Sequence, residues 1–246
     1  MSKGKKIPQG VAVERVAPVL ALLGKEAKIA GSLRRGKEYV RDVDIVFLGT
    51  LPTQAEIEKA GFEWVQGKDA KIRLIVGGMQ VDVIRAPDED GFGAAWLYLT
   101  GPHTFNIKMR SHAAALGLLL NEKGVYKPCD PEETDESQGY AFIHVKRKGE
   151  TEKRWYRRIA GKTEREVFEA LGLEYTTPPA RDDLKCFRGE VEWECEIPSA
   201  KDGSYRVWLG KNNRWNCECE GFQFRRKCRH IETAQAKYNK ECEIAS

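Results

Sequence analysis

The sequence lacks a long hydrophobic run. No apolar stretch approaches the ~20 residues that a membrane helix needs, and the opening segment, MSKGKKIPQG, has no apolar core of the kind found in secretory signals. Internal repeats are absent as well. We therefore expect an intracellular protein that is neither secreted nor bound to a membrane, and the sequence does not narrow the compartment further.

The chain also lacks a strong excess of charge. Its formal net charge is only +4, which suits an acidic partner such as nucleic acid but does not require one. The 246 residues are 41% hydrophobic and 32% charged, ordinary proportions for a globular protein with a sizeable core. Length alone allows one large domain or two smaller ones.

Two aspartates alternate along a segment, DVDIVFL, that is predicted to be a buried strand. Asp42 and Asp44 point to one face, and the intervening apolar residues point to the other. Asp82, between two valines in QVDVIR, repeats the pattern on a second strand. Convergent carboxylates need cations to pair them, and Mg²⁺ prefers such oxygen ligands, which predicts two-metal phosphoryl transfer. The alternative is that these aspartates mark strand ends facing water, since a lone D-x-D pair is common.

The segment before this strand, KIAGSLRRGKE, favours the catalytic interpretation. It is predicted to be a strand that opens into a short helix at Ser32, where unpaired N–H groups can bind an anion. Arg34, Arg35 and Lys37 add positive charge beside it. A phosphate-binding element next to metal-binding carboxylates is what a nucleotidyl transferase needs.

A second motif lies near the C-terminus. Its pattern, C-x-C-x8-C-x-H, places two pairs of metal-binding side chains on extended chain, and its members are Cys217, Cys219, Cys228 and His230. Four protein ligands leave no position for water, which predicts a closed structural Zn²⁺ site. The alternative is a set of metal-free thiol and imidazole groups in a reduced protein.

Hydrophobic patterning predicts the order of the elements. Helices are expected over residues 11–23, 53–60, 105–120 and 163–173, strands over 28–31 and 42–48, a hairpin of 72–76 with 80–84, and an acidic loop over 127–138.

Three blocks resemble, in order, the palm and thumb of family X DNA polymerases, the DNA polymerase beta group. They are GSLRRGKEYVRDVDIVFL, QVDVIR and YLTGPHTFNIKMRSHAAALGLLLNE, and the resemblance covers residues 5–182. The C-terminal motif resembles the SWIM zinc finger, including the strand YRVWL before it and the helix HIETAQAKY after it. The resemblance implies an α+β fold with a nucleotidyltransferase palm, a mixed sheet with flanking helices, at 1–95, a helical and β thumb at 96–182, and a small SWIM finger at 183–246.

The resemblance also implies roles for matching residues. Asp42 and Asp44 would bridge two Mg²⁺ ions, for which Mn²⁺ can substitute, and Asp82 would ligate the catalytic ion. Arg110 would touch the template strand. The residues that would contact the nucleotide are Gly31, Ser32, Arg35, Tyr98, Gly101, Asn106 and, by its place in KIP, Lys6.

Two departures from the family pattern follow Tyr98. Pro102 stands where the family commonly has Ser, and because X-Pro bonds adopt cis far more readily than other bonds, we predict a cis Gly101–Pro102 bond. Leu99 replaces the usual Phe beside the sugar, which puts discrimination against ribonucleotides in question.

Residues 146–162 are rich in Lys and Arg, interleaved with aromatic residues. For a polymerase thumb we predict that Arg154, Arg157 and Arg158 contact DNA phosphates, which would give sequence-independent affinity. The alternative is a solvated hairpin face, as most charge runs are.

The resemblance implies a DNA-directed DNA polymerase that adds dNTPs to a primer 3′-hydroxyl and fills short gaps during repair. Because the chain starts almost at the palm, we expect no lyase domain and no 5′-deoxyribose-phosphate lyase activity. The zinc finger would clamp DNA or bind a protein partner, and the sequence leaves both open.

Two other hypotheses remain. One is a template-independent terminal nucleotidyl transferase, which Leu99 favours and which Asn106 and Arg110 oppose. The other is a catalytically silent nucleic-acid-binding scaffold, which the intact aspartate triad opposes because clustered carboxylates are unfavourable for stability.

Overall fold

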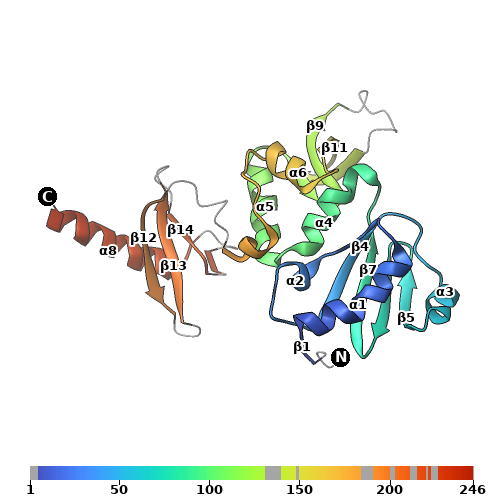
Figure 1. The fold of residues 1–246 in the computed structure, drawn as a ribbon. Coiled ribbons are helices and arrows are strands. Elements are labelled where there is room, and N and C mark those ends of the chain that lie inside the picture. Colours follow the sequence, from blue (N-terminus) through green and yellow to red (C-terminus); the bar gives the residue numbers. More distant parts are fainter. Residues whose placement is uncertain are drawn as a thin grey trace. The chain divides into compact units, whose positions relative to one another are not determined.

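The computed structural model describes residues 5–130, 140–147, 150–183, 191–199, 203–210, 215–219, 221–222 and 227–245. The chain divides into two compact units, Met1–Leu184 (unit 1) and Lys185–Ser246 (unit 2) (Figure 1). Among the described helices, none is both long and apolar enough to cross a membrane.

A five-stranded mixed sheet forms the first half of unit 1. Its strands, in spatial order, are β2 (Ala27–Ile29), β4 (Asp42–Phe47), β7 (Met79–Arg85), β6 (Lys71–Val76) and β5 (Glu63–Lys68). β4 and β7 are parallel, and the other neighbours are antiparallel. A separate pair, β1 (Ile7–Pro8) and β3 (Tyr39–Val40), ties the start of the chain to the segment just before β4.

One face of this sheet is apolar and buried under helices. α1 (Gln9–Leu23) and α3 (Gln54–Lys59) pack there, so that Val16 and Ile57 join Ile45, Leu74 and Val81 in one core cluster. Burial alternates over the first four residues of β4, Asp42 to Ile45, as the period of two requires, and Val46 is buried in a second cluster with Ala86 and Ala95. The opposite face therefore receives the polar residues of the same strands, and α4 (Phe92–Thr100) covers one end of it.

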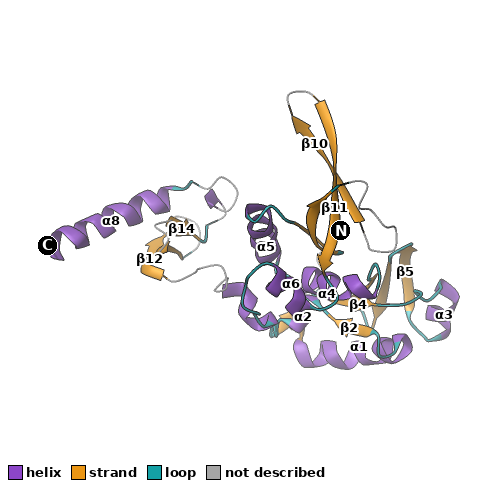
Figure 2. Cartoon of the chain, turned by 90° about the horizontal axis from the view of Figure 1, so that it is seen from above, coloured by secondary structure: helices purple, strands orange, loops and turns teal. Residues whose placement is uncertain are grey.

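The second half of unit 1 combines helices with a four-stranded sheet. Its helical elements are the 3-10 turn η1 (Glu89–Gly91), α5 (His103–Ala115), α6 (Glu164–Ala170) and the 3-10 segment η4 (Pro178–Asp183), whereas the short helix α2 (Gly31–Arg34) lies in the first half, between β2 and β3. The sheet has the order β10-β11-β9-β8, with bounds Tyr140–Arg147, Glu150–Ala160, Gly124–Cys129 and Leu119–Asn121. Figure 2 shows β10 and β11 as a long projecting hairpin.

Unit 2 is a three-stranded antiparallel sheet and one helix. The strands follow the order β12 (Val191–Pro198), β13 (Ser204–Gly210) and β14 (Trp215–Cys217), and the helix is α8 (Arg229–Ala245). Val207, Phe222 and Ala234 pack in one small core together with Cys217 and Cys219. The metal-binding motif is therefore part of the core of unit 2.

The predicted α+β class is confirmed, and the predicted hairpin and most elements occur within a few residues of their expected ends. The helix predicted over residues 105–120 is wrong at its C-terminal end. α5 stops at Ala115 because Gly117 adopts φ +75°, and the N–H of Leu118 bonds back to the carbonyl of Ala113 at 2.9 Å. The chain then enters β8. The predicted loop over 127–138 also starts too early, since β9 runs to Cys129, and residues 131–138 lie outside the described ranges.

A buried carboxylate joins distant segments of unit 1. Glu164 accepts two bonds from Arg34, at 2.6 and 2.7 Å, and one from Arg181 at 3.0 Å. Tyr175 donates a further bond at 3.1 Å, and the Arg34 guanidinium lies 3.4 Å from the centre of the Trp96 ring. Burial alone would raise the pKa of Glu164, but the two arginines outweigh it and hold that pKa below its usual value. The network links α2, α4, α6 and η4.

Replacing Glu164 by Gln leaves two buried arginines without an anion. Because breaking a buried pair from one side is strongly unfavourable, we expect Glu164→Gln to lower the free energy of unfolding by about 3–5 kcal/mol, measured by urea unfolding at pH 7. Glu169→Gln, an exposed position on the same helix, is the control and should change it little.

The difference in unfolding free energy between wild type and Glu164→Gln should also depend on pH. The folded-state pKa of Glu164 is depressed, so its stabilisation is complete above its unfolded pKa of about 4.3 and is lost as pH falls through the folded value. The difference between wild type and Glu164→Gln should therefore shrink below about pH 4. A difference that stays constant from pH 7 to pH 3 would contradict the ionic role.

Candidate functional site

Strand register brings the three aspartates to one face of the sheet. Asp44 and Asp82 are direct partners across the parallel pair β4–β7, and Asp42 lies opposite Gln80 on the same two strands. Asp82 is only 5% exposed, whereas Asp42 and Asp44 are half-buried. The face is the polar one, opposite α1, as the alternation of the sequence predicts.

Gly31 brings the predicted phosphate-binding segment against this cluster. Its φ is +63°, and a Cβ at this position would lie 2.3 Å from Oδ2 of Asp44. The N–H of Ala30 also bonds to the carbonyl of Asp44 at 2.8 Å. Only glycine combines this backbone conformation with the close approach, so the start of α2 and the carboxylate of Asp44 are in direct contact.

The carboxylate of Asp44 is buried beside two other carboxylates, which disfavours its ionised form. Burial raises the pKa of its carboxyl to about 6, and the nearby charges of Asp42 and Asp82 act in the same direction. A hard divalent cation is the kind of group that relieves such repulsion. Among the described residues, the Cys/His group of unit 2 is the one set of three or more Cys, His, Asp or Glu side chains gathered closely enough to hold a metal ion, so the aspartates do not form such a group as they stand.

Two cations on β6, not singled out from the sequence, hold Asp82. Arg73 is its register partner and donates at 2.7 and 3.0 Å, and Lys71 donates at 2.7 Å. Burial would raise the pKa of Asp82, but these bonds outweigh it and lower that pKa. The pairing of Arg73 with Asp82 could have been predicted from the sequence. In a hairpin that turns at Gly77–Gly78, Val76 pairs with Met79, and counting back along both strands places Arg73 opposite Asp82.

Four of the residues predicted to contact the nucleotide lie together at the end of α4; they are Arg35, Tyr98, Gly101 and Asn106. A Cβ on Gly101 would lie 3.6 Å from Nη1 of Arg35 and 3.9 Å from Nδ2 of Asn106. Arg35 donates to the carbonyl of Thr100, and Asn106 donates to the carbonyl of Tyr98 at 2.7 Å. Oδ1 of Asn106 is buried and has no partner within the described part of the chain. The predicted cis Gly101–Pro102 bond is confirmed.

The other assigned residues lie around this group. Ser32 is half-buried on α2, directly after Gly31. Lys6 is exposed immediately before β1, and the partner strand β3 ends two residues before Asp42. Arg110, exposed on α5, lines the same small hollow as Tyr98 and Asn106. The roles of Ser32, Lys6 and Arg110 stay predictions.

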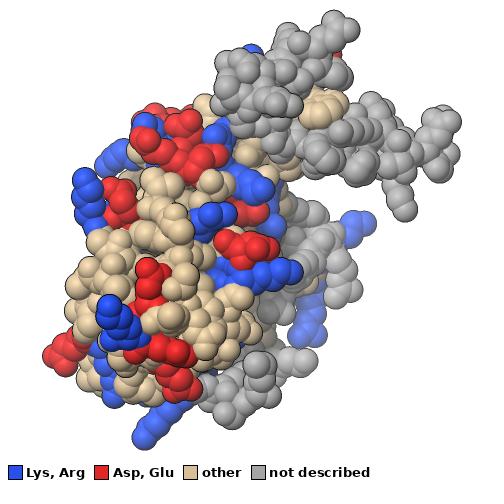
Figure 3. Space-filling model, turned by 90° about the vertical axis from the view of Figure 1, so that its right-hand side faces the viewer, with Lys and Arg blue, Asp and Glu red and all other residues tan. Residues whose placement is uncertain are grey.

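The three arginines of β11 differ in their surroundings. Arg158 forms an ion pair with Asp88 at 2.9 Å and also donates to the carbonyl of Lys123 at 3.3 Å. Its side chain braces β11 against the segment around η1, so a contact with DNA would compete with these bonds. Arg154 and Arg157 are half-buried, and their contact with DNA stays a prediction. The side chains of residues 140–153 lie outside the description, and on the face of the molecule in Figure 3 acidic and basic side chains are interspersed.

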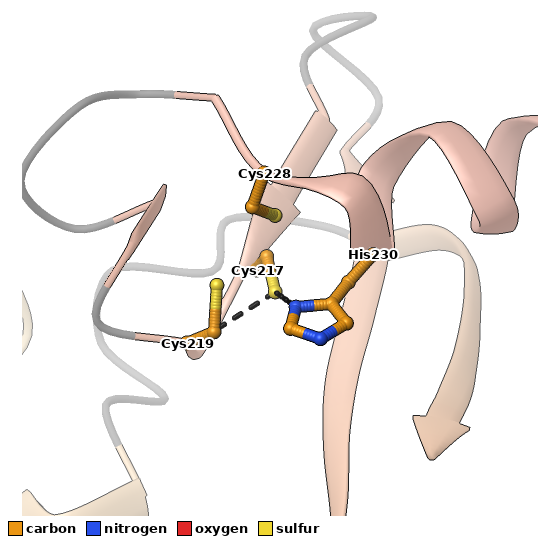
Figure 4. Close-up of side chains that lie close together, drawn as sticks. All are labelled: Cys217, Cys219, Cys228 and His230. Atoms are coloured by element: carbon orange, nitrogen blue, oxygen red, sulfur yellow. Dashed lines mark hydrogen bonds between the residues drawn. The ribbon is translucent and has the colours of Figure 1, made fainter. Parts of the chain in front are cut away.

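The predicted zinc ligands converge in unit 2. The ligand atoms of Cys217, Cys219, Cys228 and His230 all lie within 4.8 Å of one another (Figure 4). Nδ1 of His230 is 3.8 Å from Sγ of Cys217, and the N–H groups of Cys219 and Phe222 point at the sulfurs of Cys217 and Cys219 at 3.5 and 3.4 Å. A tetrahedral site with Zn–S bonds of about 2.3 Å has its ligand atoms about 3.8 Å apart, so the set fits Zn²⁺.

Two thiols of this site, those of Cys217 and Cys228, are held protonated in the absence of metal. Burial raises the pKa values of Cys217 and Cys228, so the metal has to displace protons from them. Because Cys217 and Cys219 also belong to the core of unit 2, we infer that metal binding supports the fold of this unit.

Removing Zn²⁺ should unfold unit 2. A structural zinc site contributes about 10 kcal/mol or more of folding free energy, so a strong chelator or Cys219→Ser should abolish the ordered signal of unit 2. The measurement is the fluorescence of Trp193 and Trp215, which contact each other with ring centres 5.7 Å apart. Cys195→Ser, at a half-buried cysteine outside the motif, is the control and should keep both the signal and one bound zinc. Native fluorescence in the zinc-free protein would contradict a structural role.

Asp44 should make metal-free unit 1 less stable as pH rises. Its folded pKa of about 6 is above its unfolded value, so its stabilising contribution is present at low pH and lost as pH rises through 6. Relative to wild type, Asp44→Asn should therefore gain up to about 3 kcal/mol between pH 4 and pH 8 in Mg²⁺-free buffer. Urea unfolding measures the gain, and Glu63→Gln on the exposed edge strand should show none. Equal pH profiles for wild type and Asp44→Asn would contradict the charge repulsion.

Comparison with known families matches both parts of the chain. Residues 95–182 match the DNA polymerase beta thumb, and residues 205–236 match the SWIM zinc finger. No curated protein matches the sequence.

Among solved structures, unit 1 has clear relatives in fold. Polymerase beta of Leishmania infantum, in a ternary gap complex, is 24% identical with a TM-score of 0.53, over 72% of this chain and 71% of that chain. The same protein in a ternary P/T complex is 22% identical with a TM-score of 0.52, over 73% of this chain and 78% of that chain. The chain therefore shares the polymerase beta fold with these structures, and it carries a segment that matches the polymerase beta thumb and another that matches the SWIM zinc finger.

Proposed function

We propose that the protein is a DNA-directed DNA polymerase that transfers deoxynucleotides from dNTPs to a primer 3′-hydroxyl and fills short gaps during repair. The observation that carries this proposal is the contact of Gly31 with Asp44, beside Asp82 on the next strand. Gly31 begins the segment that we expect to bind phosphate, and it lies on the same face of the sheet as the three carboxylates. That arrangement suits nucleotidyl transfer.

The aspartate face fits a pair of Mg²⁺ ions. Asp42, Asp44 and Asp82 offer hard oxygen ligands, and the raised pKa of Asp44 reports negative charge that a cation would balance. Bound Mg²⁺ supplies positive charge at the triphosphate and lowers the pKa of the attacking hydroxyl. Mn²⁺ has the same preference for such ligands and can substitute.

The chain's own residues would position the substrates. Gly31 leaves room beside Asp44, and Arg35 would bind the triphosphate together with Ser32. Asn106 is fixed by its bond to the carbonyl of Tyr98, and its buried Oδ1 faces no protein donor within the described residues, so it is free to accept one from a ligand. At the minor-groove edge every base pair presents an acceptor, so a contact that tests base-pair geometry rather than sequence would use the second N–H of the Asn106 amide as the donor.

Arg73 and Lys71 would keep Asp82 ionised and oriented. They hold the two oxygens of its carboxylate from the neighbouring strand, at 2.7 Å each for the shortest bonds. The same two side chains raise the local positive potential on the face where DNA phosphates would approach. Unit 2 would add contacts to DNA or to a protein partner.

Loss of Asp82 should abolish turnover and leave the fold intact. We expect Asp82→Asn to lower single-nucleotide incorporation by more than about a thousandfold, because a ligand of the reacting centre is lost. The assay uses a one-nucleotide gapped duplex with Mg²⁺ and each dNTP separately, and Glu63→Gln should retain wild-type rates. Incorporation by Asp82→Asn at the normal rate would rule out the metal assignment.

The same assay separates the three hypotheses when a bare primer strand is run in parallel. Templated insertion that is strongest on the gap supports a gap-filling polymerase. Equal addition to gapped duplex and bare primer, regardless of template, supports a terminal transferase. Absence of incorporation with both Mg²⁺ and Mn²⁺ supports a nucleic-acid-binding scaffold.

A further inference from the structure

Asp182, near the end of unit 1, contacts two cations, Arg35 and Lys37, beside the segment that we expect to bind phosphate. Asp182, at the end of η4, is 2.5 Å from Nζ of Lys37 through Oδ2. Its other oxygen, Oδ1, is 3.8 Å from Nε of Arg35. One carboxylate therefore bridges two cations that follow α2 directly in the chain.

The backbone next to Asp182 is firmly anchored. The preceding residue, Arg181, is fully buried and bound to Glu164 at 3.0 Å and to the carbonyl of Thr176 at 3.1 Å. Asp182 itself has a side chain that is 34% exposed, and that of Lys37 is 48% exposed. The carboxylate is thus held near the cations by its neighbour, but the contact itself is open to solvent and to solutes.

Arg35 is incompletely neutralised by this contact. Its Nε is buried and has no hydrogen-bond partner in the part of the chain that the structure describes, because Asp182 is too distant for a bond. Burial lowers the pKa of Arg35, and the charges of Asp182 and Asp44 offset this only in part. A ligand with more negative charge would satisfy Arg35 better than Asp182 does.

The neighbouring cation of the RRGK run is not available to a ligand. Arg34 is committed to Glu164 by two bonds and to Thr100 by a third at 2.7 Å. Arg35 donates one bond, from Nη1 to the carbonyl of Thr100, and its Nε has no partner among the described residues, so Arg35 and Lys37 are the two cations of this run that an incoming polyphosphate can recruit. Asp182 is the anion that already occupies both.

We propose that Lys37 is a further phosphate-binding residue and that Asp182 is an internal anion that holds Lys37 and Arg35 until the triphosphate of a nucleotide displaces it. The identification of the anion as a nucleotide triphosphate rests on the proposed function. Displacement exchanges one carboxylate for a polyphosphate of higher charge, so Asp182 lowers the affinity for nucleotide and excludes weaker anions, such as monophosphates, from the site.

The test is isothermal titration calorimetry on the full-length protein. One titration uses inorganic tripolyphosphate, and a separate one uses a dNTP with Mg²⁺. We expect Asp182→Asn to bind both ligands about two- to fivefold tighter, the range of a partly exposed charge pair. Lys37→Gln should bind both more weakly. Glu63→Gln and Lys68→Gln, on the exposed strand β5, remove the same charges away from the site and should change little.

The double variant Lys37→Gln with Asp182→Asn tests the mechanism. If Asp182 acts through Lys37, removing Asp182 should gain less affinity in the Lys37→Gln background than in the wild type. The gain should also shrink at high salt, since the contact is solvent-exposed. In steady-state assays Asp182→Asn should lower KM for dNTP and leave kcat unchanged, a change that loss of a merely structural contact would not produce.

The outcomes are distinct from those of the proposed function. Unchanged or weaker binding by a folded Asp182→Asn overturns the inference, even if the wild type extends primers. Tighter tripolyphosphate binding by Asp182→Asn supports the inference, even if neither protein extends a primer and the polymerase proposal fails. Asp182→Ser, which removes the charge with a smaller side chain, repeats the test if Asp182→Asn does not fold.

Discussion

Glu164 is a buried anion between two arginines that come from distant parts of unit 1. Arg34 ends α2, the helix that begins at Gly31, and Arg181 lies in η4 near the end of the unit. Because each charge is taken out of water, each needs the others, and the geometry of α2 is set by residues 130 or more positions further along the chain. The position of Arg35, Lys37 and Asp182 at the site depends on this arrangement.

The fold could be predicted largely from local pattern and resemblance. Alternation along β4 and β7 gave both the buried face and the polar face, and the Gly77–Gly78 turn gave the hairpin. The prediction failed where local pattern is ambiguous. The apolar run after α5 suits a helix or a strand equally, and the choice is made by the glycine that ends the helix and by pairing with β9.

The site was predictable as far as its motifs extend, and no further. The zinc ligands and the approach of Gly31 to Asp44 follow from short spacings. The pairing of Asp182 with Lys37 does not, because it depends on where the segment after α6 returns, which only tertiary packing decides. Arg158 is the converse case: its place in a basic run favours DNA contact, yet its ion pair with Asp88 is invisible in sequence.

The parallel pairing of β4 with β7 affects how the protein is made. β7 cannot join β4 by a tight turn, so the intervening chain, including α3, β5 and β6, must be synthesised before Asp44 and Asp82 can become neighbours. Such non-local contacts form slowly compared with a hairpin or a helix. An emerging chain therefore exposes Asp44 to water, and its burial and its repulsion by Asp82 arise only when β7 pairs with β4.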